Sequence, residues 1–241
     1  MANNFFGENG KKYDSIRQKY PQECIDYIYE LSKGRKILDI GCGTGISSRQ
    51  LESKGFRVVG IDGDDKMLQV SKEYDDSIDY IQASAEELPF EDGSYDNVSA
   101  FGSFHWFCNA IAVNEIKRVL KDNGIFFVIN KWDRGKYYQI LKNVLKRFNC
   151  EKSESVKNDY TPFEILQENN FRNVSSGSFI SFEEYSIDEI ASLAQTSALW
   201  KFVDSDIRPN VIEELTKEYS KELNNGVFIR ELEVVVVSGI K

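Results

Sequence analysis

The chain has 241 residues and a mass of 27.7 kDa, which fits one α/β domain with additional elements and requires no second core. Its 30 Lys and Arg residues stand against 39 Asp and Glu residues, and the net charge of −9 disfavours nucleic acid and anionic membranes as partners. The 4 cysteines form no C-x-x-C pair and there is 1 histidine, so we expect neither a metal site nor a disulfide framework.

The N-terminal residues have no basic start followed by an apolar stretch, which a secretory leader would require. The longest apolar runs, around Phe126 and Val234, have the length of strands rather than of membrane spans. We therefore expect a soluble, cytoplasmic protein. Residues 14–33 place apolar side chains at helical spacing, with Pro21 near a helix start, and predict one or two helices.

Strands and helices then alternate along the chain. We expect strands at 36–40, 57–61, 78–82, 95–101 and 124–130, and helices near 45–54, 65–74 and 109–121. This alternation predicts an α/β fold with a doubly wound, mainly parallel sheet, in which ligands bind at the carboxyl ends of the strands.

A glycine-dense turn, residues 39–45, follows the first strand, and Asp62 closes the second. Glycines at alternate positions let the chain turn sharply and let a ligand approach backbone N–H groups. Asp62 follows at about the distance at which a nucleotide-binding unit offers a carboxylate to ribose hydroxyls. The pair predicts an adenosine-containing ligand; the alternative is a structural turn that binds nothing.

The loop also distinguishes between adenosine ligands. A dinucleotide fingerprint, G-x-G-x-x-G, would need glycine at position 46, where Ile46 stands. Asp39 places a carboxylate beside the turn, which disfavours a pyrophosphate and suits a ligand with an ammonium and a sulfonium. The loop therefore favours S-adenosylmethionine over NAD or FAD.

Residues 36–45 resemble the first motif of the class I S-adenosylmethionine-dependent methyltransferases, specifically the small-molecule group. Further segments resemble later motifs of that family in order: 58–62, 83–90, 94–98, and 118–121 with Gly124. The resemblance covers roughly residues 34–132 and implies a Rossmann-like sheet of seven strands with an antiparallel last strand and helical cap elements.

The resemblance also implies which residues contact the cofactor: Asp39, Gly41, Cys42, Gly43, Gly45, Asp62, Gly63, Met67, Ser84, Ala85, Glu86 and Phe101. It implies no metal. One position departs from the family pattern. The residue before Ala85 is commonly an acid that contacts the adenine amino group, whereas Ser84 stands here, so that contact is expected to be weaker or to come from the backbone.

After Trp132 the pattern changes. We expect a helix at 134–149, a polar connection at 151–160, a short helix from the cap Thr161-Pro162 to about 169, a strand near 173–182, a helix from the capping box Ser186/Glu189 to about Trp200, a helix at 209–223 and a closing strand at 227–237. The single domain of residues 1–241 then divides into an N-terminal helical cap (1–34), a cofactor-binding core (35–132), an acceptor-side region (133–225) and the closing strand (226–241).

Residues 101–107 follow the fourth strand, where this fold places its acceptor site, and they hold the only histidine among four aromatic residues. Three roles are open for His105: general base, orientation of the acceptor, or packing. The segment also resembles carboxyl methyltransferases, which favours a carboxylate acceptor. The expected acceptor contacts are Tyr13, Arg17, Phe104, Trp106, Trp132 and Trp200. For Tyr13 and Arg17 the alternative is a packed helix with a surface arginine, and for Trp200 it is a core position.

We therefore expect methyl transfer from S-adenosylmethionine to a small molecule, most favourably at oxygen, with S-adenosylhomocysteine as product. One alternative is a module that binds the cofactor or a partner without catalysis. Another is a nicotinamide oxidoreductase, which Ile46 and Asp39 disfavour. Neither the acceptor nor the oligomeric state follows from the sequence.

Overall fold

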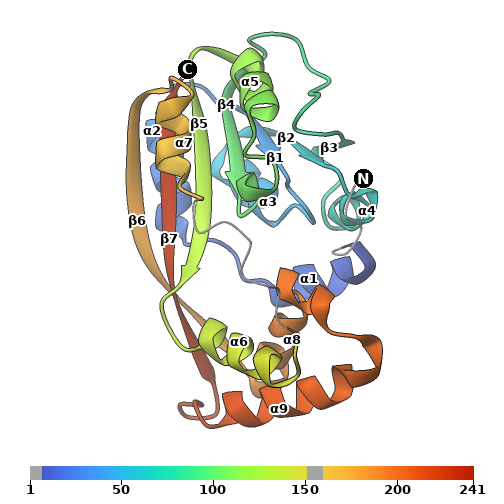
Figure 1. Ribbon diagram of the computed structural model, residues 1–241. Helices are drawn as coiled ribbons and strands as arrows, with labels where there is room; N and C mark the ends of the chain where they lie inside the picture. The colour runs from blue at the N-terminus through green and yellow to red at the C-terminus, as the bar shows by residue number, and fades with distance from the viewer. Residues whose placement is uncertain (1–6, 151–159) are drawn as a thin grey trace.

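The computed structural model describes residues 7–150 and 160–241. Its centre is a seven-stranded sheet in the order β3-β2-β1-β4-β5-β7-β6 (Figure 1). The strands are β1 (Lys36–Ile40), β2 (Arg57–Asp62), β3 (Asp79–Gln82), β4 (Tyr95–Phe101), β5 (Leu120–Asp133), β6 (Arg172–Tyr185) and β7 (Phe228–Ile240). β1 to β5 pair in parallel, whereas β7 lies antiparallel between β5 and β6. The predicted α/β sheet and its antiparallel last strand are confirmed.

Helices connect and flank these strands. The α-helices are α1 (Gly10–Ile16), α2 (Gln22–Leu31), α3 (Ile46–Lys54), α4 (Asp65–Tyr74), α5 (Ala110–Val119), α6 (Tyr137–Arg147), α7 (Pro162–Glu168), α8 (Ile187–Gln195) and α9 (Arg208–Ser220). The 3-10 helices are η1 (Gly7–Asn9), η2 (Phe104–Trp106), η3 (Ala198–Phe202) and η4 (Ser205–Ile207). None of the helices in the described part of the chain is both long and apolar enough to cross a lipid bilayer.

Alternating side chains of each strand supply two hydrophobic layers, because successive residues of a strand point to opposite faces. In β5, Phe126 and Val128 pack in the layer that holds α5 and α7. Phe127 and Ile129 pack in the other layer, against α2 and α3. Since both faces are covered, the central strands are continuous apolar runs rather than alternating ones.

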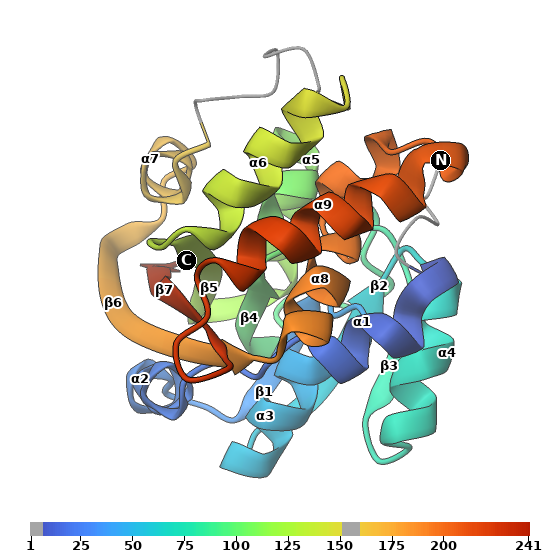
Figure 2. The ribbon, with the colours of Figure 1, turned by 90° about the horizontal axis from the view of Figure 1, so that it is seen from below.

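A third cluster lies at the end of the sheet where β5 leads into α6. We call α6, α8, η3, η4 and α9 the helical lobe; Leu141, Leu193 and Leu215 are buried in its core, and the rings of Tyr137 and Tyr219 stack at 5.8 Å. Seen from below, the lobe and α1 cross in front of the sheet (Figure 2). The lobe therefore closes one end of the domain.

The expected element boundaries hold best in the first half of the chain. β5 begins at Leu120 rather than 124 because Leu120 pairs with Tyr95, and β6 extends to Tyr185 because it pairs with β7 along its length. The helix expected to reach Trp200 ends at Gln195 and resumes as η3.

Two capping predictions have different outcomes. The capping box of Ser186 and Glu189 is confirmed. Thr161 does precede α7 with Pro162 at its start, but the Thr161 hydroxyl donates to the Glu164 carboxylate at 2.5 Å and caps no backbone N–H group. Of the connection expected at 151–160, all but the last residue falls outside the described part of the chain.

Candidate functional site

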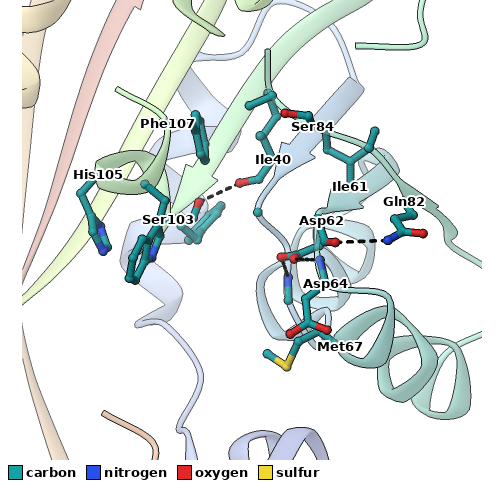
Figure 3. Close-up of a pocket in the computed structure, with 18 of the residues that line it drawn as sticks. Ile40, Ile61, Asp62, Asp64, Met67, Gln82, Ser84, Ser103, His105 and Phe107 are labelled. Atoms are coloured by element: carbon teal, nitrogen blue, oxygen red, sulfur yellow. Dashed lines mark hydrogen bonds between the residues drawn. The ribbon is translucent and has the colours of Figure 1, made fainter. Parts of the chain in front are cut away.

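A cavity of about 860 Å³ opens at the carboxyl ends of β1, β2 and β4 (Figure 3). This volume falls within the range of about 300–1,000 Å³ that is typical of small-molecule and cofactor sites. Its wall is formed by the ends of β1 to β4, the segments that follow them, α4, η3 and the N-terminal arm, by which we mean residues 10–21, that is α1 and its connection to α2. The lining residues are Tyr13, Arg17, Ile40, Gly41, Gly43, Ile61, Asp62, Gly63, Asp64, Met67, Gln82, Ala83, Ser84, Ala85, Glu86, Phe101, Gly102, Ser103, His105, Trp106, Phe107 and Ala198.

Asp62 is held rigidly at the end of β2. Its two carboxylate oxygens accept hydrogen bonds of 2.8 Å from the backbone N–H groups of Gly43 and Asp64. Burial raises the pKa of this carboxyl, while the backbone donors oppose the shift because they favour the charged form. The glycine loop and the acid thus form one unit, although they are 19 residues apart in the chain.

The glycine loop is tight because its neighbours leave no room for side chains. Gly41 has φ +69°, and a Cβ there would lie 2.5 Å from the Cβ of Ser103. Ser103 in turn donates a hydrogen bond of 2.7 Å to the carbonyl of Ile40. Gly45, with φ +82°, is the residue immediately before α3, and a Cβ there would meet Tyr80 rather than the cavity. The loop therefore presents backbone to a ligand mainly at Gly41 and Gly43.

Asp39 does not reach the cavity. It is fully buried behind the loop, where one oxygen accepts from Ser47 and Ser48 and the other from Ser99. Burial raises its pKa to about 6, although the three hydroxyl donors oppose that shift. Its position joins α3 and β4 to the loop, so direct contact between Asp39 and a ligand stays a prediction that the cavity wall does not support.

Ser84 stands where the family pattern has an acid beside the adenine, and the structure places the carboxylate of Glu86 next to it. The Ser84 hydroxyl donates to the Glu86 carboxylate, and the amide of Asn109 donates to the other Glu86 oxygen at 2.9 Å. The Ser84 hydrogen bond lowers the pKa of Glu86, so the carboxylate is charged at neutral pH. An acid is therefore present beside Ser84, two residues along the chain.

The segment after β4 contributes Ser103, His105, Trp106 and Phe107 to the wall, and Figure 3 shows His105 across the cavity from Asp62. The His105 ring centroid lies 5.0 Å from that of Trp106 and 5.9 Å from that of Tyr160. Burial lowers the pKa of His105 below its usual value of 6.5, so the imidazole is neutral at pH 7 and able to accept a proton.

A smaller recess of about 80 Å³ adjoins the cavity, and Tyr13, Arg17, Thr44, Lys131 and the first residues of α3 line it. The Thr44 hydroxyl is buried and has no hydrogen-bond partner in the described part of the chain. Backbone N–H groups of a helix N-terminus and two cationic side chains favour an anion. The recess therefore fits a carboxylate, such as that of an amino-acid tail.

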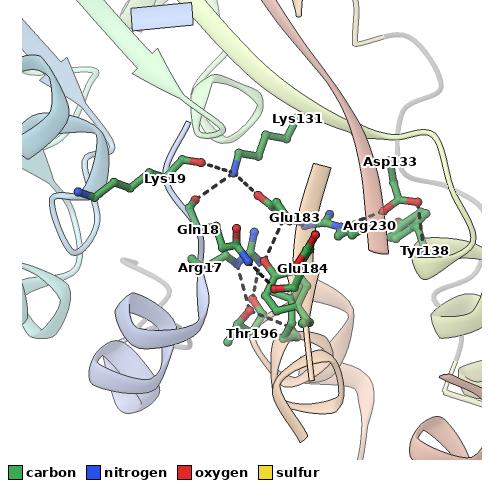
Figure 4. Close-up of polar contacts among 12 residues, drawn as sticks. Arg17, Gln18, Lys19, Lys131, Asp133, Tyr138, Glu183, Glu184, Thr196 and Arg230 are labelled. Atoms are coloured by element: carbon green, nitrogen blue, oxygen red, sulfur yellow. Dashed lines mark hydrogen bonds and ion pairs between the residues drawn. The ribbon is translucent and has the colours of Figure 1, made fainter. Parts of the chain in front are cut away.

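The two cations of the recess belong to a polar network (Figure 4). Lys131 donates to Glu183 at 2.6 Å and to the backbone carbonyls of Gln18 and Lys19. Arg230 bonds Glu183 and Asp133, while Arg17 donates to Thr196 of the lobe.

The network holds three cations, Lys131, Arg230 and Arg17, and two carboxylates, Glu183 and Asp133. One positive charge is therefore in excess beside the recess. Because Lys131 binds two carbonyls of residues 18 and 19, the same contacts fix the N-terminal arm against the sheet.

The structure brings most of the predicted site residues together but leaves several out of the main cavity. Phe104 is buried in the sheet core against Phe126. Trp200 is 4% exposed and packs in the core of the lobe. Trp132 lies near the end of β5, beyond the part of the strand that α5 and α7 cover, and is 47% exposed. Cys42 lines only the small recess. Acceptor contacts by Phe104, Trp132 or Trp200 are thus not supported by the cavity wall.

Several wall residues were not predicted: Ile40, Ile61, Asp64, Gln82, Ala83, Gly102, Ser103, Phe107 and Ala198. All but Gln82 and Ala198 directly adjoin predicted residues along the chain. Ala198 comes from the lobe, and nothing in its local sequence indicates a site. Among the residues that the structure describes, no three His, Cys, Asp or Glu side chains are grouped to hold a metal ion.

Comparison with known proteins relates this geometry to a family. A family model described as a methyltransferase domain matches residues 38–128. A relative in Mycobacterium tuberculosis, named an uncharacterised methyltransferase, is 34% identical over 119 residues, which are 49% of this chain and 49% of that protein. The chain spans about half the length of the first curated relatives it matches.

Solved structures share the fold. The YcgJ protein of Bacillus subtilis is 18% identical with a TM-score of 0.56, and the match covers 92% of this chain and 99% of that one. Phosphoethanolamine N-methyltransferase 2 of Haemonchus contortus, solved with S-adenosyl-L-methionine, has a TM-score of 0.56 at 20% identity, covering 98% and 57%. The family model thus identifies residues 38–128 as a methyltransferase domain, and the sheet order agrees with the α/β fold expected from the sequence.

Proposed function

We propose that this chain transfers a methyl group from S-adenosylmethionine to a small-molecule acceptor, with an oxygen atom, such as that of a carboxylate, as the favoured acceptor atom. The observation that supports this most is one continuous cavity whose wall carries both carboxylates and aromatic rings. Asp62 and Glu86 contribute carboxylates to its wall, and His105, Trp106 and Phe107 contribute aromatic rings. In this proposal residues 35–132 hold the cofactor and residues 133–225 shape the acceptor side.

Each part of the cofactor has a matching feature in the wall. Asp62, fixed by two backbone N–H groups, would accept hydrogen bonds from the ribose hydroxyls. Ser84, Ala85 and Glu86 would face the adenine. The recess beside Arg17, with its unpartnered Thr44 hydroxyl, would hold the carboxylate of the amino-acid tail. When bound, the cofactor supplies an electrophilic methyl group on a positively charged sulfur.

The remaining requirement is placement of the acceptor in line with that methyl group, at about 3 Å, in a site from which water is excluded. The aromatic wall from Ser103 to Phe107 supports water exclusion. For a hydroxyl acceptor, the neutral His105 would accept the proton that the acceptor loses. For a carboxylate acceptor no proton is lost, and His105 would instead orient the group by a hydrogen bond.

The test is transfer of a tritiated methyl group from S-adenosylmethionine to panels of small acids, phenols, amines and thiols. We expect labelled product in the acid or phenol panel and binding of S-adenosylhomocysteine by calorimetry. Binding without transfer to any panel would favour a non-catalytic module. Absence of binding, together with fluorescence quenching by NADH, would overturn the proposal in favour of an oxidoreductase.

A further inference from the structure

The sheet has two edges that differ greatly in length. β3 forms one edge with only 4 residues, whereas β6 forms the other with 14. Figures 1 and 2 both show β6 as the outermost strand at its side of the molecule. Because an edge strand carries unpaired backbone N–H and C=O groups, a short edge offers little to a partner and a long edge offers a template for pairing.

The register shows which backbone groups of β6 are free. The N–H of Arg134 donates to the carbonyl of Glu231 at 2.9 Å, so the odd-numbered residues of β7 direct their backbone groups toward β5. Glu231 is the register partner of Phe182. The backbone groups of Phe182, and by alternation those of Ile180 and Ser178, therefore point away from β7.

One contact agrees with this direction. The side-chain amide of Gln18 donates to the backbone carbonyl of Glu184 at 2.8 Å. Gln18 therefore takes the place of a neighbouring strand at the C-terminal end of β6. The two preceding even-numbered positions, Ile180 and Phe182, have their side chains exposed by 54% and 64%. Free backbone groups and exposed apolar side chains thus coincide on the same two residues.

The middle of this edge also lacks the usual protection against pairing. Residues 174–182 contain no charged residue and no proline, which are the common means of blocking an edge strand. The neighbouring carboxylate of Glu233 is bonded by Arg134 and Ser178, so its charge is compensated. Two chains that each carry a net charge of −9 can therefore approach here with little repulsion.

We propose that a second copy of this chain pairs with β6 in antiparallel orientation about a two-fold axis beside Ser181. The two sheets then join into one. Ile180 lies opposite the partner's Phe182, and Phe182 opposite the partner's Ile180, with their free backbone groups facing each other. Each apolar side chain is covered by its cross-strand neighbour, which stabilises the pair.

The first test is the mass of the full chain in solution by sedimentation equilibrium. Wild type is expected at twice 27.7 kDa. Phe182→Lys is expected to weaken dimerisation by at least about tenfold, because it places two cations at the joint. Ile111→Lys is the matched control, since Ile111 on α5 is 63% exposed but far from any edge, and it stays dimeric. A monomeric wild type, or a Phe182→Lys dimer as strong as wild type, overturns the proposal.

A crosslink tests the register. Ser181 faces the partner's Ser181 in a non-hydrogen-bonded pair, where Cα atoms approach to about 4.5 Å, close enough for a disulfide. In a Cys108→Ser background, which removes the partly exposed native thiol, Ser181→Cys is expected to give covalent dimers under mild oxidation. Ser178→Cys is the control and stays uncrosslinked. Crosslinking of Ser178→Cys but not of Ser181→Cys contradicts this register.

Discussion

The two sides of the cavity are built in different ways. On the cofactor side, a backbone loop and a carboxylate hold each other through bonds from Gly43 to Asp62, and the chain positions involved are close to the ends of consecutive strands. On the side of the recess, the N-terminal arm, β5, β6, β7 and the lobe are joined by side chains, chiefly Lys131, Glu183 and Arg230. The first kind of site depends on local geometry, and the second on partners that are distant in sequence.

This difference explains why one side matches known proteins and the other is less predictable. A loop whose glycines adopt positive φ tolerates few substitutions, because a side chain would meet Ser103 or Tyr80. A buried ion network can be replaced by apolar side chains of similar volume with little loss of stability. We therefore expect the two sides to respond differently to mutation.

The largest effect is expected in the ion network beside the recess. Glu183→Ala leaves Lys131 and Arg230 buried without their shared carboxylate and should lower the free energy of unfolding by about 3–5 kcal/mol. Urea unfolding followed by circular dichroism measures it. The neighbouring Glu184→Ala, on an exposed side chain, should change stability by less than about 0.5 kcal/mol. Equal changes in the free energy of unfolding for the two variants would show that the ion network does not stabilise this part of the molecule.

On the cofactor side, Gly41→Ala should lower the free energy of unfolding by about 2–4 kcal/mol, from backbone strain and the 2.5 Å contact with Ser103. Gly226→Ala is the matched control: its φ is +83°, but a Cβ there meets no atom within 4 Å. Only the strain remains, roughly 1–2 kcal/mol. If both variants lose the same stability in urea unfolding, close packing of the loop against Ser103 contributes nothing.

His105→Ala tests the aromatic wall. If His105 accepts a proton, kcat should fall by about 100-fold, or about 2.7 kcal/mol, while affinity for S-adenosylhomocysteine stays within about twofold. Because burial lowers the pKa of His105, the wild-type rate should be flat near pH 7 and fall only as pH drops below 6.5. Rates across pH measure this, and His105→Ala should lose that acidic fall. Wild-type rates in the variant would make His105 a packing residue.

Asp62→Ala should weaken S-adenosylhomocysteine binding by about 1–3 kcal/mol through loss of charge-assisted hydrogen bonds. Calorimetry measures the affinity, and Asp65→Ala, at an exposed position three residues on, should bind as wild type does. Unchanged affinity in Asp62→Ala would remove this carboxylate from the proposed ribose contact.

The first half of the fold was predictable from sequence because each element there carries its own local pattern. Glycine spacing, an acid at a strand end and apolar runs of strand length depend on neighbours in the chain, and β1, β2, β4 and α4 begin and end within about one residue of expectation. Most of the cofactor-side cavity wall follows from those positions. The placement of Trp132 and Trp200 did not, because an aromatic residue packs equally well in a cavity wall and in a core.

What the sequence determined by itself is the local chemistry: a loop that only glycine can form, a carboxylate next to it, and an apolar sheet. What only the tertiary structure decided is which distant groups meet. Asp39 turned inward to three hydroxyls, Ala198 reached the cavity from the lobe, and Lys131 met Glu183 across strands 52 residues apart in the chain. The physical reason is that backbone conformation is limited by adjacent residues, whereas burial and charge pairing depend on the packing of the whole chain.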